Sequence, residues 1–344
     1  MKRMLFLSVV LLCAFPALAA EYPRVSFALW GPGKQVWIPL GEFTDLEGPM
    51  KERKINTEEG WEPDPLEGLP VHYIRNATEG TKTVLPHWEQ PVILQPGKKP
   101  LPLKNIRMIE GEACAAVEAG FLGVAEGLKQ PQEGYGVALA VDAAHVKAAV
   151  FPVDRTVQLK PEEQKTLWQV LDTLMRQQLD AEIPRDVTVD YMKRSFEGNP
   201  AAEEEAAQAM KLYEGLVSGS PERRLELGLA PGGPGEAPVL YVRAGWFVGD
   251  RLGWAMAVVV PQGPDGWNFD ALKVLDSLSG FSDGVIGYSM DYDNFSHLEM
   301  VAVIDGRTWW LVSGSHKEGS WYTLQQPFIF DPEGTGLADY ATGC

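Results

Sequence analysis

The last third of this chain, residues 239–330, constrains the fold most, because one strand-like segment follows another there. The expected strands are Val239–Val248, Leu252–Val260, Gly284–Met290, Glu299–Ile304, Thr308–Ser313 and Trp321–Phe330. Asp305-Gly306 stands between two apolar runs, and such a pair predicts a tight hairpin because both turn residues need a positive φ. In Val239–Val248 apolar residues alternate with a set that contains Arg243 and Gly245, which is typical of a half-buried strand. These features predict an antiparallel sheet.

Three helices are expected ahead of this sheet. Lys160–Ala181 has Pro161 in its first turn, then two glutamates at the positive end of the helix, and its leucines recur on one face. Asn199–Val217 and Ser220–Gly228 are the second and the third. A further segment, Glu112–Leu128, has apolar residues at helical spacing, and we interpret it as a helix although each of its glycines costs a helix about 1 kcal/mol.

Short strand-like runs account for much of the remaining chain. They are Val25–Trp30, Gln35–Pro39, Val71–Ile74, Pro91–Leu94, Leu103–Ile109, Val137–Val141 and Val146–Val153. The last two are expected to pair with each other through the turn at 142–145. Residues 229–238 are rich in proline and glycine and form the clearest break in the chain. The predicted fold class is therefore α+β, with a mixed region at 20–228, a linker at 229–238 and an antiparallel β region at 239–344.

Residues 1–19 have the three parts of a bacterial signal peptide. Lys2 and Arg3 supply the positive charge, Met4–Phe15 is apolar, and Ala17-Leu-Ala19 is a small-residue cleavage site. The apolar run is shorter than the roughly 20 residues that a bilayer requires. No second run is long enough for a membrane span. We therefore expect cleavage near Ala19 and an exported protein, either periplasmic or secreted.

The chain is acidic, with a formal charge of −17 that falls to −19 when Lys2 and Arg3 are removed with the signal peptide. So much negative charge repels nucleic acid and anionic membrane surfaces, which are excluded as partners. A cationic ligand or bound metal ions would suit it better. The alternative is that the excess carboxylates simply keep an exported protein soluble.

Two cysteines, Cys114 and Cys344, remain in the processed chain. Export favours a disulfide between them, and by chain entropy a bridge closing so long a loop would add about 5 kcal/mol of stability. Against this pairing, Cys344 is the last residue, where chains fray, and Cys114 lies among small apolar residues that suit a buried thiol. Both alternatives remain open at this point.

An acidic segment precedes the expected strand that ends at Ile304. The residues with the spacing of calcium-loop ligands are Asp291, Asp293 and Glu299. The segment Asp291–Val303 resembles the loop-and-strand repeat of FG-GAP and VCBS proteins, over about 13 of the 344 residues. Phe295 and Ser296 replace the third acidic residue and the glycine of that repeat. The resemblance implies a loop followed by a strand, with calcium as the one cofactor it points to; the alternative is a loop that only shapes the turn.

Aromatic and histidine side chains near this loop are candidates for ligand binding. Trp309 and Trp310 are adjacent in a strand and must point to opposite faces, so one of them lies on the less buried side unless that side is also covered. They suit a platform for a sugar or peptide, and core packing is the alternative. His297 and His316 are expected to approach each other across the sheet with Glu299, the alternative being solvated loop histidines. No histidine spacing is typical of a zinc site.

These features lead us to expect an exported binding or interaction protein without catalytic activity. Its surface would be the loop at 291–299 with the neighbouring aromatics, and its partner a protein, a peptide or a carbohydrate. The competing class is an exported hydrolase with a carboxylate and histidine site between the two regions, which a buried cluster of such residues would favour. A third class is a structural partner with no small ligand.

Overall fold

The computed structural model describes most of the chain from residue 24 onwards. The described residues are 24–32, 34–43, 62–63, 73–85, 87–113, 116–129, 131, 135–182, 200–232, 235–279, 292–316, 319–325 and 338–343. The expected signal peptide at 1–19, the expected strand Gly284–Met290, and the residues Cys114, Cys344 and Asp291 lie outside them. The disulfide therefore stays a prediction.

The described part of the chain is mostly β, with 52% strand and 20% helix, and the expected α+β class is wrong. The described part of the chain contains the helices α1 (Glu79–Val84), α2 (Pro161–Glu182) and α4 (Pro200–Val217). The expected helices Lys160–Ala181 and Asn199–Val217 are confirmed as α2 and α4. No described helix is both long enough and apolar enough to cross a membrane.

Two expected helices are strands instead. Most of the described residues of Glu112–Leu128 lie in β7 (Lys104–Ala113) and β8 (Ala116–Val124), and most of Ser220–Gly228 lies in β11 (Glu222–Ala230). In β8 a Cβ on Gly120 would lie 2.1 Å from a carbonyl oxygen of the neighbouring strand, so this glycine permits close strand packing. The spacing of the apolar residues in 112–128 also fits a helix, because short apolar runs fit both periods.

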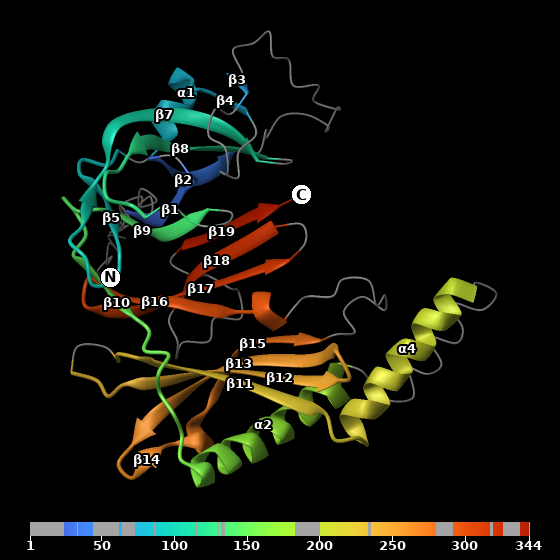
Figure 1. The fold of residues 1–344 in the computed structure, drawn as a ribbon. Coiled ribbons are helices and arrows are strands. Elements are labelled where there is room, and N and C mark those ends of the chain that lie inside the picture. The colour runs from blue at the N-terminus through green and yellow to red at the C-terminus, as the bar shows by residue number, and fades with distance from the viewer. Residues whose placement is uncertain are drawn as a thin grey trace, which may run out of the picture.

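A nine-stranded antiparallel sheet forms the top layer in Figure 1, in the order β3-β4-β7-β8-β2-β1-β9-β5-β6. The strands not yet given are β1 (Val25–Trp30), β2 (Gln35–Phe43), β3 (Glu62–Pro63), β4 (Tyr73–Asn76), β5 (Pro91–Leu94), β6 (Leu101–Pro102) and β9 (Gly136–Asp142). Only Leu103 separates β6 from β7, although β6 pairs with β5 and β7 pairs with β8. Residues 101–113 therefore connect two strands, β6 and β7, that are far apart in the order of the sheet. The sheet curls around a core of its own that contains Trp30, Ile38 and Phe121.

The middle sheet has the order β10-β16-β17-β18-β19. Its strands are β10 (Ala148–Pro152), β16 (His297–Ile304), β17 (Arg307–His316), β18 (Gly319–Gln325) and β19 (Ala338–Gly343). The predicted hairpin is confirmed, because β16 and β17 are joined by Asp305 and Gly306 with φ values of 47° and 80°. The expected pairing of Val137–Val141 with Val146–Val153 is wrong: β9 belongs to the nine-stranded sheet, and β10 pairs with β16.

The third sheet lies against α2 and α4 and is called here the helix-backed sheet (Figure 1). It contains β11, β12 (Val239–Val248), β13 (Arg251–Gly263), β14 (Gly266–Trp267) and β15 (Lys273–Ser279). Leu229 and Ala230 belong to β11, which pairs with β12 along its whole length. The strands on either side of the proline- and glycine-rich break therefore belong to one sheet.

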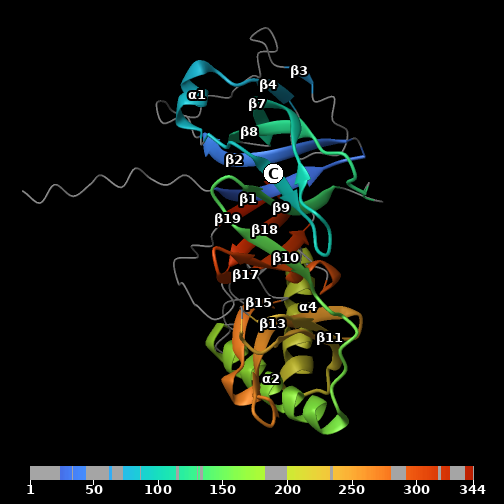
Figure 2. The same ribbon diagram turned by 90° about the vertical axis from the view of Figure 1, so that its left-hand side faces the viewer.

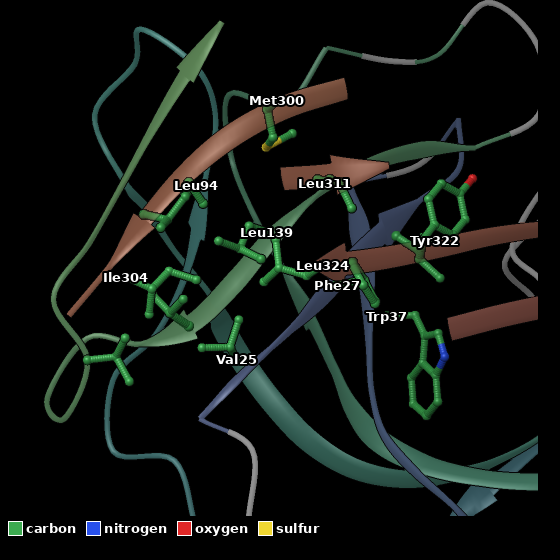
Figure 3. Close-up of a cluster of buried hydrophobic side chains, with 14 of the residues drawn as sticks. Val25, Phe27, Trp37, Leu94, Leu139, Met300, Ile304, Leu311, Tyr322 and Leu324 are labelled. Atoms are coloured by element: carbon green, nitrogen blue, oxygen red, sulfur yellow. The ribbon is translucent and has the colours of Figure 1, made fainter. Parts of the chain in front are cut away.

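The middle sheet is covered on both faces. The layers follow one another as the nine-stranded sheet, the middle sheet, the helix-backed sheet and the helices (Figures 1 and 2). Met300 and Leu311 point to the nine-stranded sheet and meet side chains such as Phe27 there (Figure 3). Val301 and Trp310 point the other way and pack against the helix-backed sheet. A strand between two layers is buried on both sides, which is why apolar runs rather than alternation mark the centre of this protein.

Asp142 ties the end of β9 to the preceding loop. Its side chain has no exposed surface, and it accepts hydrogen bonds from Arg24 Nη1 at 2.7 Å, from the Gln90 amide at 3.0 Å and from the Glu89 amide at 3.2 Å. Burial alone would raise the pKa of this carboxyl group, but the hydrogen bonds together hold it below the ordinary value of 3.8. The contribution of Asp142 to stability is therefore present above about pH 4 and is lost as the pH falls through the lowered pKa.

We expect Asp142→Asn to lower the free energy of unfolding at neutral pH by about 1–3 kcal/mol, because a buried donor loses its acceptor. Urea denaturation at neutral and at acidic pH measures this. The loss should shrink at acidic pH, where the parent carboxylate also becomes protonated. An equal loss at both pH values would contradict the assignment.

Candidate functional site

A polar row crosses the face of the helix-backed sheet that meets the middle sheet, with Arg243 buried at its centre and Glu226 and Asp276 partly exposed at its ends. Glu226 on β11 pairs with Arg243 on β12, Arg243 pairs with Ala257 on β13, and Ala257 pairs with Asp276 on β15. Directly opposed residues share one face of a sheet. Ala257 belongs to the core that also contains Trp310 of the middle sheet, so the row faces that sheet.

Arg243 is the centre of this row. Its side chain is only 3% exposed, and its Nη2 lies 2.5 Å from Glu226 Oε1. Its Nη1 donates to the carbonyl oxygen of Phe295 at 2.9 Å, and the guanidinium lies 4.6 Å from the centre of the Tyr292 ring. The half-buried expectation for Val239–Val248 is wrong, since nine of its ten residues are buried. A charge is tolerated there because it is paired and hydrogen-bonded.

The acidic loop, residues 291–299, lies over the row, and the structure describes its residues 292–299. Tyr292, Phe295 and Leu298 are all buried. The Tyr292 hydroxyl donates to the Arg243 carbonyl oxygen at 2.9 Å, and the Tyr241 hydroxyl donates to the Ser296 carbonyl oxygen. The loop is therefore anchored to the helix-backed sheet by apolar side chains and by hydrogen bonds.

Asp276 ends the row on β15. Burial raises the pKa of its carboxyl group from 3.8 to about 6, and the Ser277 amide and the Ser296 hydroxyl offset part of that increase. The Ser296 hydroxyl has no partner at good hydrogen-bond geometry, although it lies close enough to affect this carboxyl group. No lysine or arginine among the described residues forms an ion pair with Asp276.

The structure describes two of the three expected calcium ligands. Asp293 is exposed in the short helix η4 (Tyr292–Asn294), and Glu299 is the extra residue of a bulge in β16. The Glu299 carboxylate accepts a hydrogen bond from Ser313 Oγ at 2.5 Å. No group of three or more metal-binding side chains occurs in the part of the chain that the structure describes. Because Asp291 lies outside that part, the calcium site stays a prediction.

The two tryptophans do point to opposite faces, and both faces are covered. Trp310 has no exposed surface, and its ring lies 5.9 Å from that of Tyr241 at 69°, an edge-to-face contact. Trp309 is partly buried on the side of the nine-stranded sheet. Trp310 therefore presents no face to a ligand, and its side chain is part of the core.

The two histidines have different positions. His297 is half-buried, with its Nε2 2.5 Å from Arg243 Nη1 and also against the Asp293 carbonyl oxygen. Its partner across the middle sheet is Ser313, and His316 lies three residues further along β17. The side chain of His316 is outside the described part, so its expected approach to His297 stays a prediction.

Sequence reasoning missed the residues that build this cluster. Those residues are Glu226, Tyr241, Arg243, Asp276 and Ser296. A usable signal was present only for Arg243, because it is the one charged residue within the otherwise apolar Val239–Val248. A charged residue in such a strand must find a partner on another strand.

The cluster combines a carboxyl group, a hydroxyl group and an imidazole, which are also the groups of many hydrolases. Ser296, however, has no exposed surface, and the guanidinium of Arg243 lies against the His297 ring. A nucleophile must reach its substrate, and this hydroxyl is enclosed by protein. The described contacts therefore hold the acidic loop against the helix-backed sheet.

Comparison of the chain with protein-family models, curated proteins and solved structures finds no match.

Proposed function

We propose that this is an exported binding protein, without catalytic activity, that captures a basic protein or peptide through the acidic loop. The proposal rests on one observation, the difference in burial between the apolar and the acidic side chains of the loop. Tyr292 and Phe295 are buried as anchors, while the Asp293 side chain is exposed and Glu299 is partly exposed. A loop held in one conformation loses little entropy when it binds, which favours affinity.

The charge of the protein supports the same class of partner. The formal charge is −17, or −19 without Lys2 and Arg3, and a field of one sign attracts partners of the opposite sign over distances beyond direct contact. Glu226, whose side chain is 43% exposed, is bound to Arg243, so this pair adds no net charge beside the loop. A basic segment would therefore meet the exposed carboxylate of Asp293 and the partly exposed carboxylate of Glu299.

Binding of an octalysine peptide, measured by calorimetry at low and high salt, tests this proposal. We expect the double variant Asp293→Asn/Glu299→Gln to bind the peptide about 5- to 30-fold more weakly, because each exposed charge contributes up to about 1 kcal/mol. Binding should also weaken as salt is added. An octaglutamate peptide is the probe of opposite charge and should not bind.

The matched control removes two exposed carboxylates elsewhere. Asp250, in the turn between β12 and β13, and Asp270, in the short helix η2 (Phe269–Ala271), are both exposed. Asp250→Asn/Asp270→Asn changes the net charge by the same amount as the loop variant. If both double variants lost affinity equally, binding would depend on overall charge and not on the loop. If the parent protein did not bind the octalysine peptide, the proposal would be wrong.

A further inference from the structure

The edge of the helix-backed sheet at β11 is long and regular. β11 is the first strand in the order of that sheet, and its nine residues pair with β12 without a bulge. On its other side Leu229 exchanges two hydrogen bonds with Asp154, the Leu229 N–H donating at 2.7 Å and its carbonyl oxygen accepting at 2.9 Å. The N–H and C=O groups of a strand alternate in direction from one residue to the next. Arg223, Leu225 and Leu227 therefore direct theirs to the same outer side as Leu229.

These outward groups have no backbone partner among the described residues. β11 pairs with β12, and its one other pairing there is the bridge from Leu229 to Asp154. Proline and lysine, which commonly protect an edge strand, are absent from residues 222–228. β10, at the edge of the middle sheet, is only five residues long and ends in Pro152. The edge of β11 is therefore a template for one further strand.

The side chains along this edge are neutral as a set, although the whole chain is strongly acidic. Residues 222–228 contain two glutamates and two arginines. Arg224 and Glu226 lie on the face that meets the middle sheet, with their side chains 48% and 43% exposed. Arg243 contacts Oε1 of Glu226, so the second oxygen of that carboxylate can accept from another cation. On the opposite face Leu225 is half-buried against the core beneath α2.

We propose that β11 pairs in antiparallel fashion with β11 of a second copy of this chain, across a two-fold axis at Leu225. In this register Leu225 faces its own counterpart, and Arg223 faces Leu227 of the second copy, so every outward N–H and C=O group of these residues gains a partner. Arg224 then faces Glu226 of the second copy, and the symmetry forms this charge pair twice. The pairing does not depend on the proposed function of the acidic loop.

Other registers of the same pairing are less favourable. An axis at Arg223 would oppose two like charges, and an axis at Leu227 would require Leu229, which is already paired with Asp154. The net negative charge of two chains opposes association, but salt screens it beyond about 8 Å at physiological ionic strength. Since one strand pair is a small interface, we expect a dissociation constant on the order of 1–100 µM.

Sedimentation velocity of the protein in about 0.15 M salt measures this association. We expect the dimer fraction to rise with protein concentration. Arg224→Glu opposes two carboxylates at both symmetric contacts and should weaken association about 10- to 100-fold. Arg307→Glu is the matched control, because Arg307 is exposed at the start of β17 and the change in net charge is the same. This control should associate like the parent.

Single cysteines test the register. In a Cys114→Ser/Cys344→Ser background, Leu225→Cys should form a disulfide between the two copies on mild oxidation, because the Cα atoms of a hydrogen-bonded pair lie about 5.5 Å apart. Leu227→Cys is the matched control and should not, because its two copies would lie roughly 14 Å apart along the strands.

Three results would overturn the pairing. The first is a parent protein that remains monomeric up to about 200 µM, which needs no variant to fold. The second is a dimer that Arg224→Glu and Arg307→Glu affect equally, since its interface would then lie elsewhere or depend only on net charge. The third is equal cross-linking of Leu225→Cys and Leu227→Cys. Circular dichroism of each variant shows whether it is folded as the parent is.

Discussion

Asp276→Asn is expected to stabilise the protein at neutral pH by up to about 3 kcal/mol. The pKa of this carboxyl group is raised by burial to about 6 from the ordinary 3.8, and each unit of difference corresponds to about 1.4 kcal/mol. The folded protein therefore binds more protons than the unfolded chain between about pH 4 and 6. Stability falls as the pH rises through that window and then stays at the lower level. Asparagine has the same shape and no charge, so it removes this cost.

Urea denaturation of the parent and of Asp276→Asn at about pH 4 and about pH 7.5 measures this effect. The two proteins should be nearly equal at the acidic pH, where the parent carboxyl group is protonated, and should differ at the higher pH. Asp142→Asn is an informative control because the pKa of Asp142 is shifted the other way. A lower stability of Asp276→Asn at neutral pH would mean that the ionised carboxylate has a favourable partner.

Trp310→Ala is expected to lower the free energy of unfolding by about 3–5 kcal/mol, as removal of a fully buried tryptophan generally does. Trp310 has no exposed surface, and it packs on Tyr241 between the middle sheet and the helix-backed sheet. The cavity left behind would be bordered by two β layers, which cannot easily collapse into it. The acidic loop should also lose protection from hydrogen exchange, because Phe295 belongs to the same core.

Trp309→Ala is the matched control for this prediction. The side chain of Trp309 is partly buried against the nine-stranded sheet, so its removal should cost less than the removal of Trp310. Denaturation of both variants in urea gives the comparison. If Trp310→Ala unfolded at the same urea concentration as the parent, the stacking of the two sheets through this residue would be wrong.

The surroundings of the acidic loop could be predicted only in part from local sequence. The acidic residues drew attention to 291–299, and the loop does lie at a buried polar cluster. Its strand, β16, and the hairpin to β17 were expected from apolar runs and from Asp305-Gly306. Arg243, however, had been interpreted as a polar residue on the open side of a half-buried strand. That side is closed by the middle sheet, which no local pattern in β12 reveals.

The sequence by itself determined the elements whose signals are local. The turn at Asp305-Gly306 depends on two φ angles, and the helix α2 depends on proline, glutamate and leucine positions within a few turns. Only the tertiary structure decided that three sheets stack, that residues 116–124 and 222–230 form strands, and that Glu226, Arg243 and Asp276 share one row. Whether the second face of a strand is buried depends on the layer that packs against it. That layer comes from parts of the chain tens of residues away, beyond the range of any periodicity in the strand itself.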